Sequence, residues 1–171
     1  ELANRGVEWS ILPLIETAAG VLSAPAIAAE SNVDGVVFGA EDLAAEIGAT
    51  RTETGEEISY ARQRLVLAAS AVGIDAIDTP VADFEDTALL ETDTARSVRL
   101  GFDGKLAIHP GQVSIINAAY TPDEDEIDWA VRVLDAREES DDGVFVVDGE
   151  MIDRPLITQA ERIVARAEQT D

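Results

Sequence analysis

Four polar residues stand where apolar segments of the sequence end, and their types are those found in catalytic and metal-binding sites. They are Glu16 after "LPLI", Asp42 after "VVFGAE", Asp78 in "AIDTP" and His109 in "AIHP". Successive members lie 26, 36 and 31 residues apart, close to the length of one strand–helix unit. In parallel α/β folds the chemistry gathers at the carboxyl ends of the strands. The spacing therefore predicts that these four residues lie at strand ends on one edge of a sheet.

Glu16 and Asp42 are candidates for a metal site. A carboxylate that ends an apolar strand is unfavourable unless it is paired, solvated or bound to a metal. The chain has no cysteine and one histidine, so a metal site would use oxygen ligands, which favours Mg²⁺ or Mn²⁺ over Zn²⁺. The alternative is that Asp42 or Glu41 caps a short helix over 42–47, and that Glu16 caps the helix after it.

The other candidates also have structural alternatives. His109 could act in catalysis, but a lone histidine is usually structural, and its backbone could instead line a pocket. Asp78 could orient a loop or a ligand. Asp153, in "GEMIDRP", is by composition alone a helix N-cap. The glycines of "DGKLAIHPGQ" match neither a P-loop nor a dinucleotide-binding fingerprint.

Strands and helices alternate along the first 120 residues, which predicts a parallel sheet with helical crossovers. The expected strands cover 7–16, 33–39, 74–80 and 105–110, and the expected helices cover 17–31, 54–73, 86–101 and 111–120. Pro25 predicts an interruption in the first helix. Thr54 and Glu57 predict a capping box, Gly73 a helix end and Asp86 an N-cap.

The number of units indicates half of a barrel. A TIM barrel needs eight strand–helix units and about 250 residues. An open half barrel would expose two sheet edges, so we expect residues 1–120 to be strands five to eight of a TIM barrel in a longer protein. A small open α/β sheet is the alternative. Residues 121–171 predict an appendage outside the barrel: a helix over 121–140, a hairpin over 144–153 and a helix over 154–169.

The composition limits the class of protein. The chain has 35 acidic and 12 basic residues, a formal charge of −23, and Lys105 is its only lysine. Because 46% of the residues are hydrophobic, a packed core is expected rather than a disordered acidic tail. An acidic surface with almost no lysine predicts a halophilic protein, since bulk salt screens carboxylate repulsion. The charge argues against nucleic acids and anionic membranes as partners, because phosphate binding needs basic patches.

Other features of the sequence predict a cytoplasmic protein. The absence of cysteine excludes a disulfide framework and thiol chemistry. No apolar run reaches the roughly 18–20 residues that a membrane span needs, and no signal peptide is visible. The opening "ELANR" has no Met and looks like the tail of a helix, which suggests that a further segment precedes it.

Several longer motifs follow one another along the sequence. They are "PLIET", "DGVVFGAEDLAAEIGAT", "YARQRLVLAA", "AIDTPVADFED", "GFDGKLAIHPGQV" and "GEMIDRPLITQA". With these motifs the chain resembles the HpcH/HpaI aldolase–citrate lyase β-subunit superfamily, and within it the acyl-CoA lyases of the citramalyl-CoA and malyl-CoA type. The resemblance implies a TIM barrel and Mg²⁺-dependent cleavage of 3-hydroxyacyl-CoA to an acyl-CoA and a 2-oxo acid. Related outcomes are malyl-CoA thioesterase or malate synthase chemistry, or a citrate lyase β subunit acting on an acyl carrier protein.

The resemblance also implies roles for particular residues. Glu16 and Asp42 match the two Mg²⁺ ligands of the family, whereas Glu41 does not. Ile108 and His109 match a stretch that contacts acyl-CoA, largely through its backbone. Asp153 matches a catalytic carboxylate, and Met151 matches a residue beside the substrate. The resemblance further implies a trimer in which the C-terminal segment covers a neighbouring subunit's active site. The substrate-binding arginine of the family lies on early strands, outside this chain.

Overall fold

The structure is a computed structural model of the 171-residue chain, and it describes residues 9–140 and 143–168. By their internal contacts the residues form two compact units, Glu1–Ala119 and Tyr120–Asp171. We describe each unit by itself. Within the described residues, no helix combines the length and the apolar character that crossing a bilayer requires.

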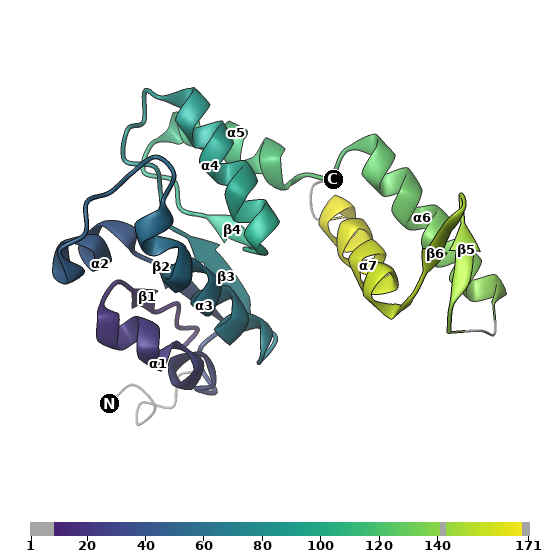
Figure 1. Cartoon of the computed structure of the whole chain (residues 1–171), viewed down its shortest axis with the longest axis horizontal. Helices are drawn as coiled ribbons and strands as arrows, with labels where there is room; N and C mark the ends of the chain where they lie inside the picture. The colour runs from purple at the N-terminus through teal and green to yellow at the C-terminus, as the bar shows by residue number, and fades with distance from the viewer. Residues whose placement is uncertain (1–8, 141–142, 169–171) are drawn as a thin grey trace. The chain divides into compact units, whose positions relative to one another are not determined.

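The first unit is built on a four-stranded parallel sheet whose strands follow one another in chain order (Figure 1). The strands are β1 (Leu14–Ile15), β2 (Gly35–Phe38), β3 (Asp75–Asp78) and β4 (Gly104–Lys105). Neighbouring strands of a (β/α)8 barrel have this sequential order, whereas the order reverses part-way through a doubly wound open sheet. The predicted α/β fold is confirmed, and the strand order favours a partial barrel over the open-sheet alternative.

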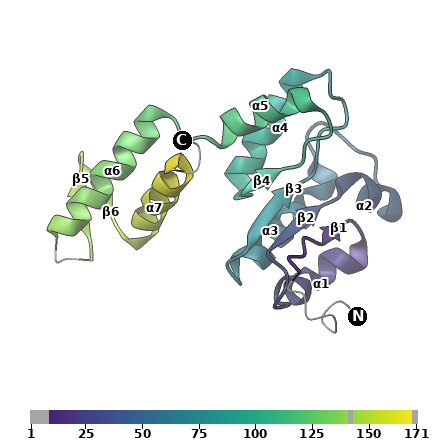
Figure 2. The ribbon, with the colours of Figure 1, turned by 180° about the vertical axis from the view of Figure 1, so that it is seen from behind.

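The helices of the first unit pack beside this sheet, as Figure 2 shows from behind. They are α1 (Ala18–Ala28), α2 (Ala40–Ile47), the 3₁₀ turn η2 (Glu56–Ile58), α3 (Ser59–Ser70), α4 (Thr87–Leu100) and α5 (Pro110–Tyr120). Ile15 and Phe38 from the strands and Leu65 from α3 are buried together in one apolar core. This core fixes the strand ends that carry the candidate site.

All four strands are shorter than predicted, and the difference is largest for β1 and β4. Of the expected strand 7–16, only Leu14–Ile15 is regular, while Ile11 forms an isolated parallel bridge to Val33, and residues 7–8 lie outside the described residues. Pro13 interrupts the ladder because it has no N–H to donate. The strand expected at 105–110 ends at Lys105. Beyond it, the backbone amides of residues 108 and 109 turn to a side chain of α5.

The predicted interruption of the first helix at Pro25 is wrong. α1 continues through Pro25 from Ala18 to Ala28. Proline removes the N–H that would bond the carbonyl of Val21, four residues earlier. Arg64 of α3 replaces that donor, because its Nε donates to the Val21 carbonyl at 2.7 Å and its Nη2 donates to the Leu22 carbonyl at 2.6 Å.

The cap predictions have mixed outcomes. Asp86 caps α4 as predicted, accepting from the Leu89 N–H at 2.9 Å, and Gly73 follows α3 with a φ of +75°. The capping box at Thr54 and Glu57 is wrong, because the Glu57 carboxylate accepts from the Thr52 hydroxyl at 2.7 Å instead. The segment then enters a 3₁₀ turn, and α3 begins only at Ser59.

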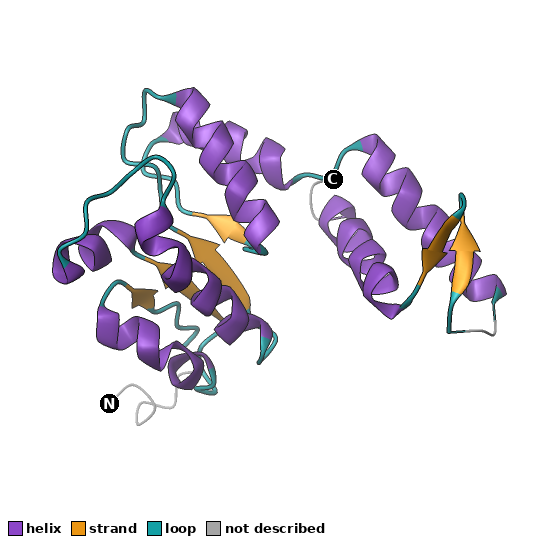
Figure 3. Ribbon diagram, viewed as in Figure 1, coloured by secondary structure: helices purple, strands orange, loops and turns teal. Residues whose placement is uncertain are grey.

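In its described residues the second unit consists of a helical pair and a β-hairpin (Figure 3). These elements are α6 (Glu124–Glu139), β5 (Phe145–Val147), β6 (Glu150–Ile152) and α7 (Arg154–Glu168). Asp148 and Gly149 form the hairpin turn with φ values of +52° and +86°, as the Asp-Gly pair predicts. Val133, Val147 and Ile152 belong to a buried core of this unit.

Candidate metal centre

The parallel pairing of β1 with β2 brings Glu16 and Asp42 together. Ile15 is in register with Phe38, so Glu16 leaves β1 beside the point where β2 turns into α2, which carries Asp42 in its first turn. Burial raises the pKa of Glu16, and the adjacent Asp42 raises it further through a hydrogen bond and through charge repulsion. Two carboxylates held in contact favour a bound cation or a shared proton.

Gly39 makes this approach possible. It lies between β2 and α2, and a Cβ at this position would be 2.6 Å from Cβ of Glu16 and 3.1 Å from its Oε2. Real Cβ atoms do not come so close, so a side chain at position 39 would displace Glu16. The glycine is required by close contact rather than by backbone conformation, since its φ of −108° suits any residue.

The neighbouring acid Glu41 has different partners. Its Oε1 accepts from Nε of Arg51 at 2.9 Å, and Nη1 of Arg51 also pairs with Glu57. Glu41 is therefore engaged by a cation of the protein, while Asp42 lies against Glu16. The structure separates two adjacent carboxylates that the sequence places side by side.

The alternative that these acids are helix caps is wrong. α2 begins at Ala40 with Gly39 as its N-cap, so both acids lie inside its first turn. α1 is capped by Thr17, whose side chain accepts from the Gly20 N–H at 3.0 Å, rather than by Glu16. Acidic residues in a first turn still interact favourably with the helix dipole.

The paired carboxylates fit a magnesium ion. Among the residues that the structure describes, no group of three or more His, Cys, Asp or Glu side chains could enclose a metal. Mg²⁺ is commonly held by one or two carboxylates, with water and substrate oxygens completing its shell. Glu16 and Asp42 would supply such a pair, and the space that Gly39 leaves open keeps the Glu16 carboxylate beside Asp42.

Asp78 belongs to a buried ion-pair network instead of facing a ligand. It accepts from Nε of Arg62 at 3.1 Å and from Nζ of Lys105 at 3.3 Å. Both cations also pair with Asp93, at 3.0 Å from Arg62 and 2.6 Å from Lys105. Burial alone would raise the pKa of Asp93, but the charges of Lys105 and Arg62 lower it. The network has two positive and two negative groups, which satisfies the requirement that buried charges be paired.

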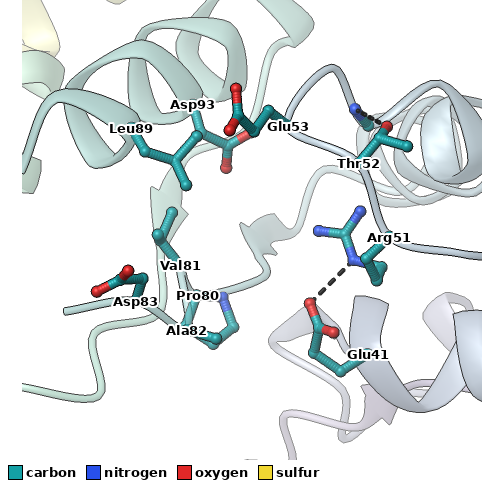
Figure 4. Close-up of a pocket in the computed structure, with 11 residues that line it drawn as sticks. Glu41, Arg51, Thr52, Glu53, Pro80, Val81, Ala82, Asp83, Leu89 and Asp93 are labelled. Atoms are coloured by element: carbon teal, nitrogen blue, oxygen red, sulfur yellow. Dashed lines mark hydrogen bonds and ion pairs between the residues drawn. The ribbon is translucent and has the colours of Figure 1, made fainter. Parts of the chain in front are cut away.

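A pocket of about 250 Å³ opens near the carboxyl ends of β2 and β3. Figure 4 shows the ion pair of Arg51 with Glu41 on one side of it and Leu89 with Asp93 on the other. The loop that follows β3, including Val81, forms part of its lining. This pocket provides space for a ligand next to the helix that carries Asp42.

The "AIHP" segment is held by a glutamine that the sequence did not single out. Oε1 of the buried Gln112 accepts from the N–H of Ile108 at 2.9 Å and from that of His109 at 3.3 Å. Its Nε2 donates to the Val81 carbonyl at 2.9 Å, which ties the segment to the loop after β3. The His109 ring stacks on Phe84, and its Nδ1 accepts from the Gly111 N–H at 3.1 Å. Ile108 is exposed.

Asp153 and Met151 lie in the second unit. Asp153 immediately precedes α7, and its carbonyl accepts from the Ile157 N–H at 3.0 Å, as the N-cap alternative predicts for its backbone. Met151 is on β6, opposite Val146, and its side chain is 67% exposed. Both residues lie in a unit separate from that of Glu16 and Asp42.

Comparison with known proteins assigns the chain to a family. A family model, HpcH/HpaI aldolase/citrate lyase, matches residues 4–110. The chain belongs to this family. The matched segment contains every element of the four-stranded sheet and both carboxylates of the pair.

Curated relatives within the HpcH/HpaI aldolase/citrate lyase family match nearly the whole chain. Mitochondrial citramalyl-CoA lyase of Rattus norvegicus is 38% identical over 180 residues, which cover 97% of this chain and 53% of the relative. A citrate lyase subunit beta-like protein of Mycobacterium tuberculosis is 36% identical over 172 residues, covering 98% of this chain and 61% of the relative. The chain thus spans little more than half the length of these relatives.

A solved structure gives the same result for the fold. Protein CitE from Mycobacterium tuberculosis, in complex with magnesium, acetoacetate and coenzyme A, superposes with a TM-score of 0.81 at 33% identity. The match covers 96% of this chain and 67% of that chain. The citrate lyase beta subunit of M. tuberculosis complexed with oxaloacetate and magnesium matches with a TM-score of 0.63 at 32% identity, covering 71% of this chain and 56% of that chain.

Three residues of the candidate site were not found from the sequence. Arg51, Gly39 and Gln112 act through contacts with residues 10 to 31 positions away, which periodicity does not reveal. Lys105 carried a usable signal. In a chain with one lysine and 35 acids, a lysine at a strand end is expected to have a buried, fixed role rather than a place on the surface.

Proposed function

We propose that the protein containing this chain is a Mg²⁺-dependent carbon–carbon lyase acting on a 3-hydroxyacyl-CoA. Malyl-, methylmalyl- or citramalyl-CoA would be split into acetyl-CoA or propionyl-CoA and glyoxylate or pyruvate. The observation that carries this proposal is that the pairing of β1 with β2 places Glu16 beside the first turn of α2, which carries Asp42, in a chain similar to citramalyl-CoA lyase over 97% of its length. Mn²⁺ would be an acceptable substitute for Mg²⁺.

Glu16 and Asp42 would hold the metal through their carboxylates. When bound, the ion would supply Lewis-acid stabilisation of charge on the oxygens of the 2-oxo acid. Arg51 would keep Glu41 out of that shell, because it already pairs with Glu41 at 2.9 Å. Gly39 would leave the room that the Glu16 side chain occupies. The chain at −23 needs such local positive charge before an anionic substrate can approach.

The second unit would supply the proton-transfer group. Asp153 would move the proton at the substrate hydroxyl or at the acetyl-CoA methyl carbon, and the exposed Met151 would contact the substrate. We propose that these residues act on a neighbouring subunit's active site in a cytoplasmic homotrimer or a multiple of it. Ile108 and His109 would contact acyl-CoA largely through backbone atoms other than their amides, which Gln112 occupies, and Ile108 also through its exposed side chain.

A carrier-linked role is the second candidate. The citrate lyase subunit beta of Leuconostoc mesenteroides subsp. cremoris is 37% identical over 161 residues, covering 92% of this chain and 53% of the relative. A subunit of that kind would use the same carboxylate pair with an acyl carrier protein. Malyl-CoA thioesterase or malate synthase chemistry would also use the same site, with hydrolysis following the carbon–carbon step.

One experiment distinguishes these functions. The full-length protein is incubated in molar KCl and Mg²⁺ with acetyl-CoA or propionyl-CoA plus glyoxylate or pyruvate, and the products are followed by mass. A new hydroxyacyl-CoA that disappears with EDTA is the result expected of the lyase. Free CoA with malate would indicate thioesterase or synthase chemistry. No reaction with any pair would contradict the proposal and favour the carrier-linked subunit.

A further inference from the structure

The N-cap residue of α2, the helix that carries Asp42, has no side chain to accept from a first-turn N–H. A helix normally begins with Ser, Thr, Asp or Asn, whose side chain accepts from a first-turn N–H. α2 begins after Gly39, which has no side chain, and a Cβ there would collide with Glu16 at 2.6 Å. The contact that places Glu16 beside Asp42 therefore removes the usual cap from α2.

Thr79, in the loop directly after β3, supplies an acceptor for the first turn of α2. The N–H of Ala40, the first residue of α2, donates to Oγ1 of Thr79 at 3.2 Å, and this hydrogen bond is buried. Thr79 follows the last residue of β3 and is 1% exposed, so water does not replace its hydroxyl. The cap thus comes from a residue 39 positions away in the sequence.

The Thr79 backbone is also fixed. Nζ of Lys105 donates to the Thr79 carbonyl at 2.7 Å, and Lys105 is itself held by Asp78 and Asp93. The buried ion-pair network therefore anchors Thr79, whose hydroxyl accepts from the first amide of α2. Through Thr79, the network and the single lysine of the chain are connected to the first turn of α2.

We propose that Thr79 is a positioning residue of the metal pair. Its hydroxyl holds Ala40, and so fixes the first turn of α2 in the orientation that directs Asp42 toward Glu16. The inference rests on the proposed function, because it takes Glu16 and Asp42 as the metal ligands. Groups that orient metal ligands typically change metal affinity by 10–100-fold when they are removed.

The test measures Mn²⁺ binding to the full-length protein by electron paramagnetic resonance, without substrate. Thr79→Val removes the hydroxyl at nearly constant shape, and Thr79→Ser keeps it. Thr94→Val is the matched control, because Thr94 is also buried and its hydroxyl donates to the Leu90 carbonyl at 2.6 Å. We expect Kd to rise about tenfold in Thr79→Val and to stay near the wild-type value in Thr79→Ser and Thr94→Val. Asp42→Asn is included as the variant that removes a ligand.

Each of the other possible results would contradict a specific part of the proposal. If Asp42→Asn loses Mn²⁺ but Thr79→Val binds as wild type does, Thr79 does not position the pair and the metal site stands. If Thr94→Val weakens binding as much as Thr79→Val does, the effect is general destabilisation and the inference fails. If the wild type binds no Mn²⁺, or Asp42→Asn binds it unchanged, the metal site itself is wrong and the inference fails with it.

A second measurement applies even if Thr79→Val does not fold. Hydrogen exchange at the Ala40 amide is followed in the wild type and in Thr79→Ser. Slow exchange in both proteins is expected, because a buried hydroxyl accepts from that amide. Exchange as fast as that of an exposed first-turn amide would overturn the proposed cap.

Discussion

Glu16 packs so closely against Gly39 that a Cβ on Gly39 would lie 2.6 Å from Cβ of Glu16. Gly39→Ala should therefore displace the Glu16 carboxylate from Asp42. Overpacking of this kind costs about 1–3 kcal/mol of unfolding free energy. Mn²⁺ affinity should fall in the same variant, because the two carboxylates no longer converge. Urea unfolding and Mn²⁺ titration of the full-length protein measure the two effects.

Gly143→Ala is the control for this substitution. A Cβ on Gly143 has no atom within 4 Å, so the change adds a methyl group in open space. Both stability and metal affinity should stay near wild type. Wild-type Mn²⁺ affinity in Gly39→Ala would show that the contact with Glu16 has no bearing on the metal pair.

Asp42 and Glu41 are adjacent acids with different predicted roles. Asp42→Asn should abolish Mg²⁺-dependent turnover, with a loss beyond the roughly 100-fold that changes to outer-shell groups cost. Glu41→Gln should keep activity within about threefold of wild type, because Glu41 is paired with Arg51 at 2.9 Å. Steady-state rates at several Mg²⁺ concentrations measure both variants. The reverse result, an inactive Glu41→Gln and an active Asp42→Asn, would transfer the ligand role to Glu41.

The alternation of apolar runs and helix signals was enough to predict the α/β fold, because strands that are joined by helical crossovers run parallel. The order of the elements then places the carboxyl ends of the strands on one edge of the sheet. The position of Glu16 directly after β1 followed from the same pattern, as did that of Asp42 close to the point where β2 turns into α2. The pattern could not show which side chain of "AEDL" turns toward Glu16, since the first amide of the helix, that of Ala40, donates to Thr79 in the loop after β3.

The errors have a common physical cause. Pro25 predicted a break, but the carbonyl it leaves without its helical donor is satisfied by Arg64, 43 residues from Val21. Asp78 was expected to orient a loop or a ligand, but it is paired in a buried network with two cations that are distant in sequence. Local rules fail at these positions because the compensating group comes from another element. A rule that considers only the neighbours of a residue in the sequence cannot detect such a partner.

Glu57 gives a prediction for acid stability. Burial alone would raise its pKa, but hydrogen bonds from Thr52, from the backbone amides of Glu57 and Thr52 and from Arg51 together lower the pKa from 4.5 to about 2. The contribution to stability is therefore complete above about pH 4.5 and is lost as the pH falls toward 2. Glu57→Gln should cost about 1–2 kcal/mol at pH 7, allowing for solvent screening.

Denaturant unfolding at pH 7, 4.5 and 3 follows that difference. The stability gap between wild type and Glu57→Gln should narrow steadily below pH 4.5. In that range Glu57 of the unfolded chain takes up a proton, while Glu57 of the folded protein stays ionised until the pH approaches 2. Glu56→Gln is the matched control, because Glu56 is the adjacent, exposed acid, and it should change stability by less than about 0.5 kcal/mol. A gap for Glu57→Gln that stays constant from pH 7 to pH 3 would contradict the lowered pKa.

Arg64 and Pro25 should be coupled in stability although one is in α3 and the other in α1. Arg64→Met leaves the Val21 carbonyl without a partner, which should cost about 1–3 kcal/mol. Pro25→Ala restores the N–H that normally bonds this carbonyl, so Arg64→Met should cost about 1 kcal/mol less in that background. Denaturant unfolding of the two single variants and the double variant gives the interaction energy. If Arg64→Met costs the same unfolding free energy with and without Pro25→Ala, Arg64 does not compensate for the N–H that Pro25 lacks. Arg64 would then stabilise α1 by packing alone.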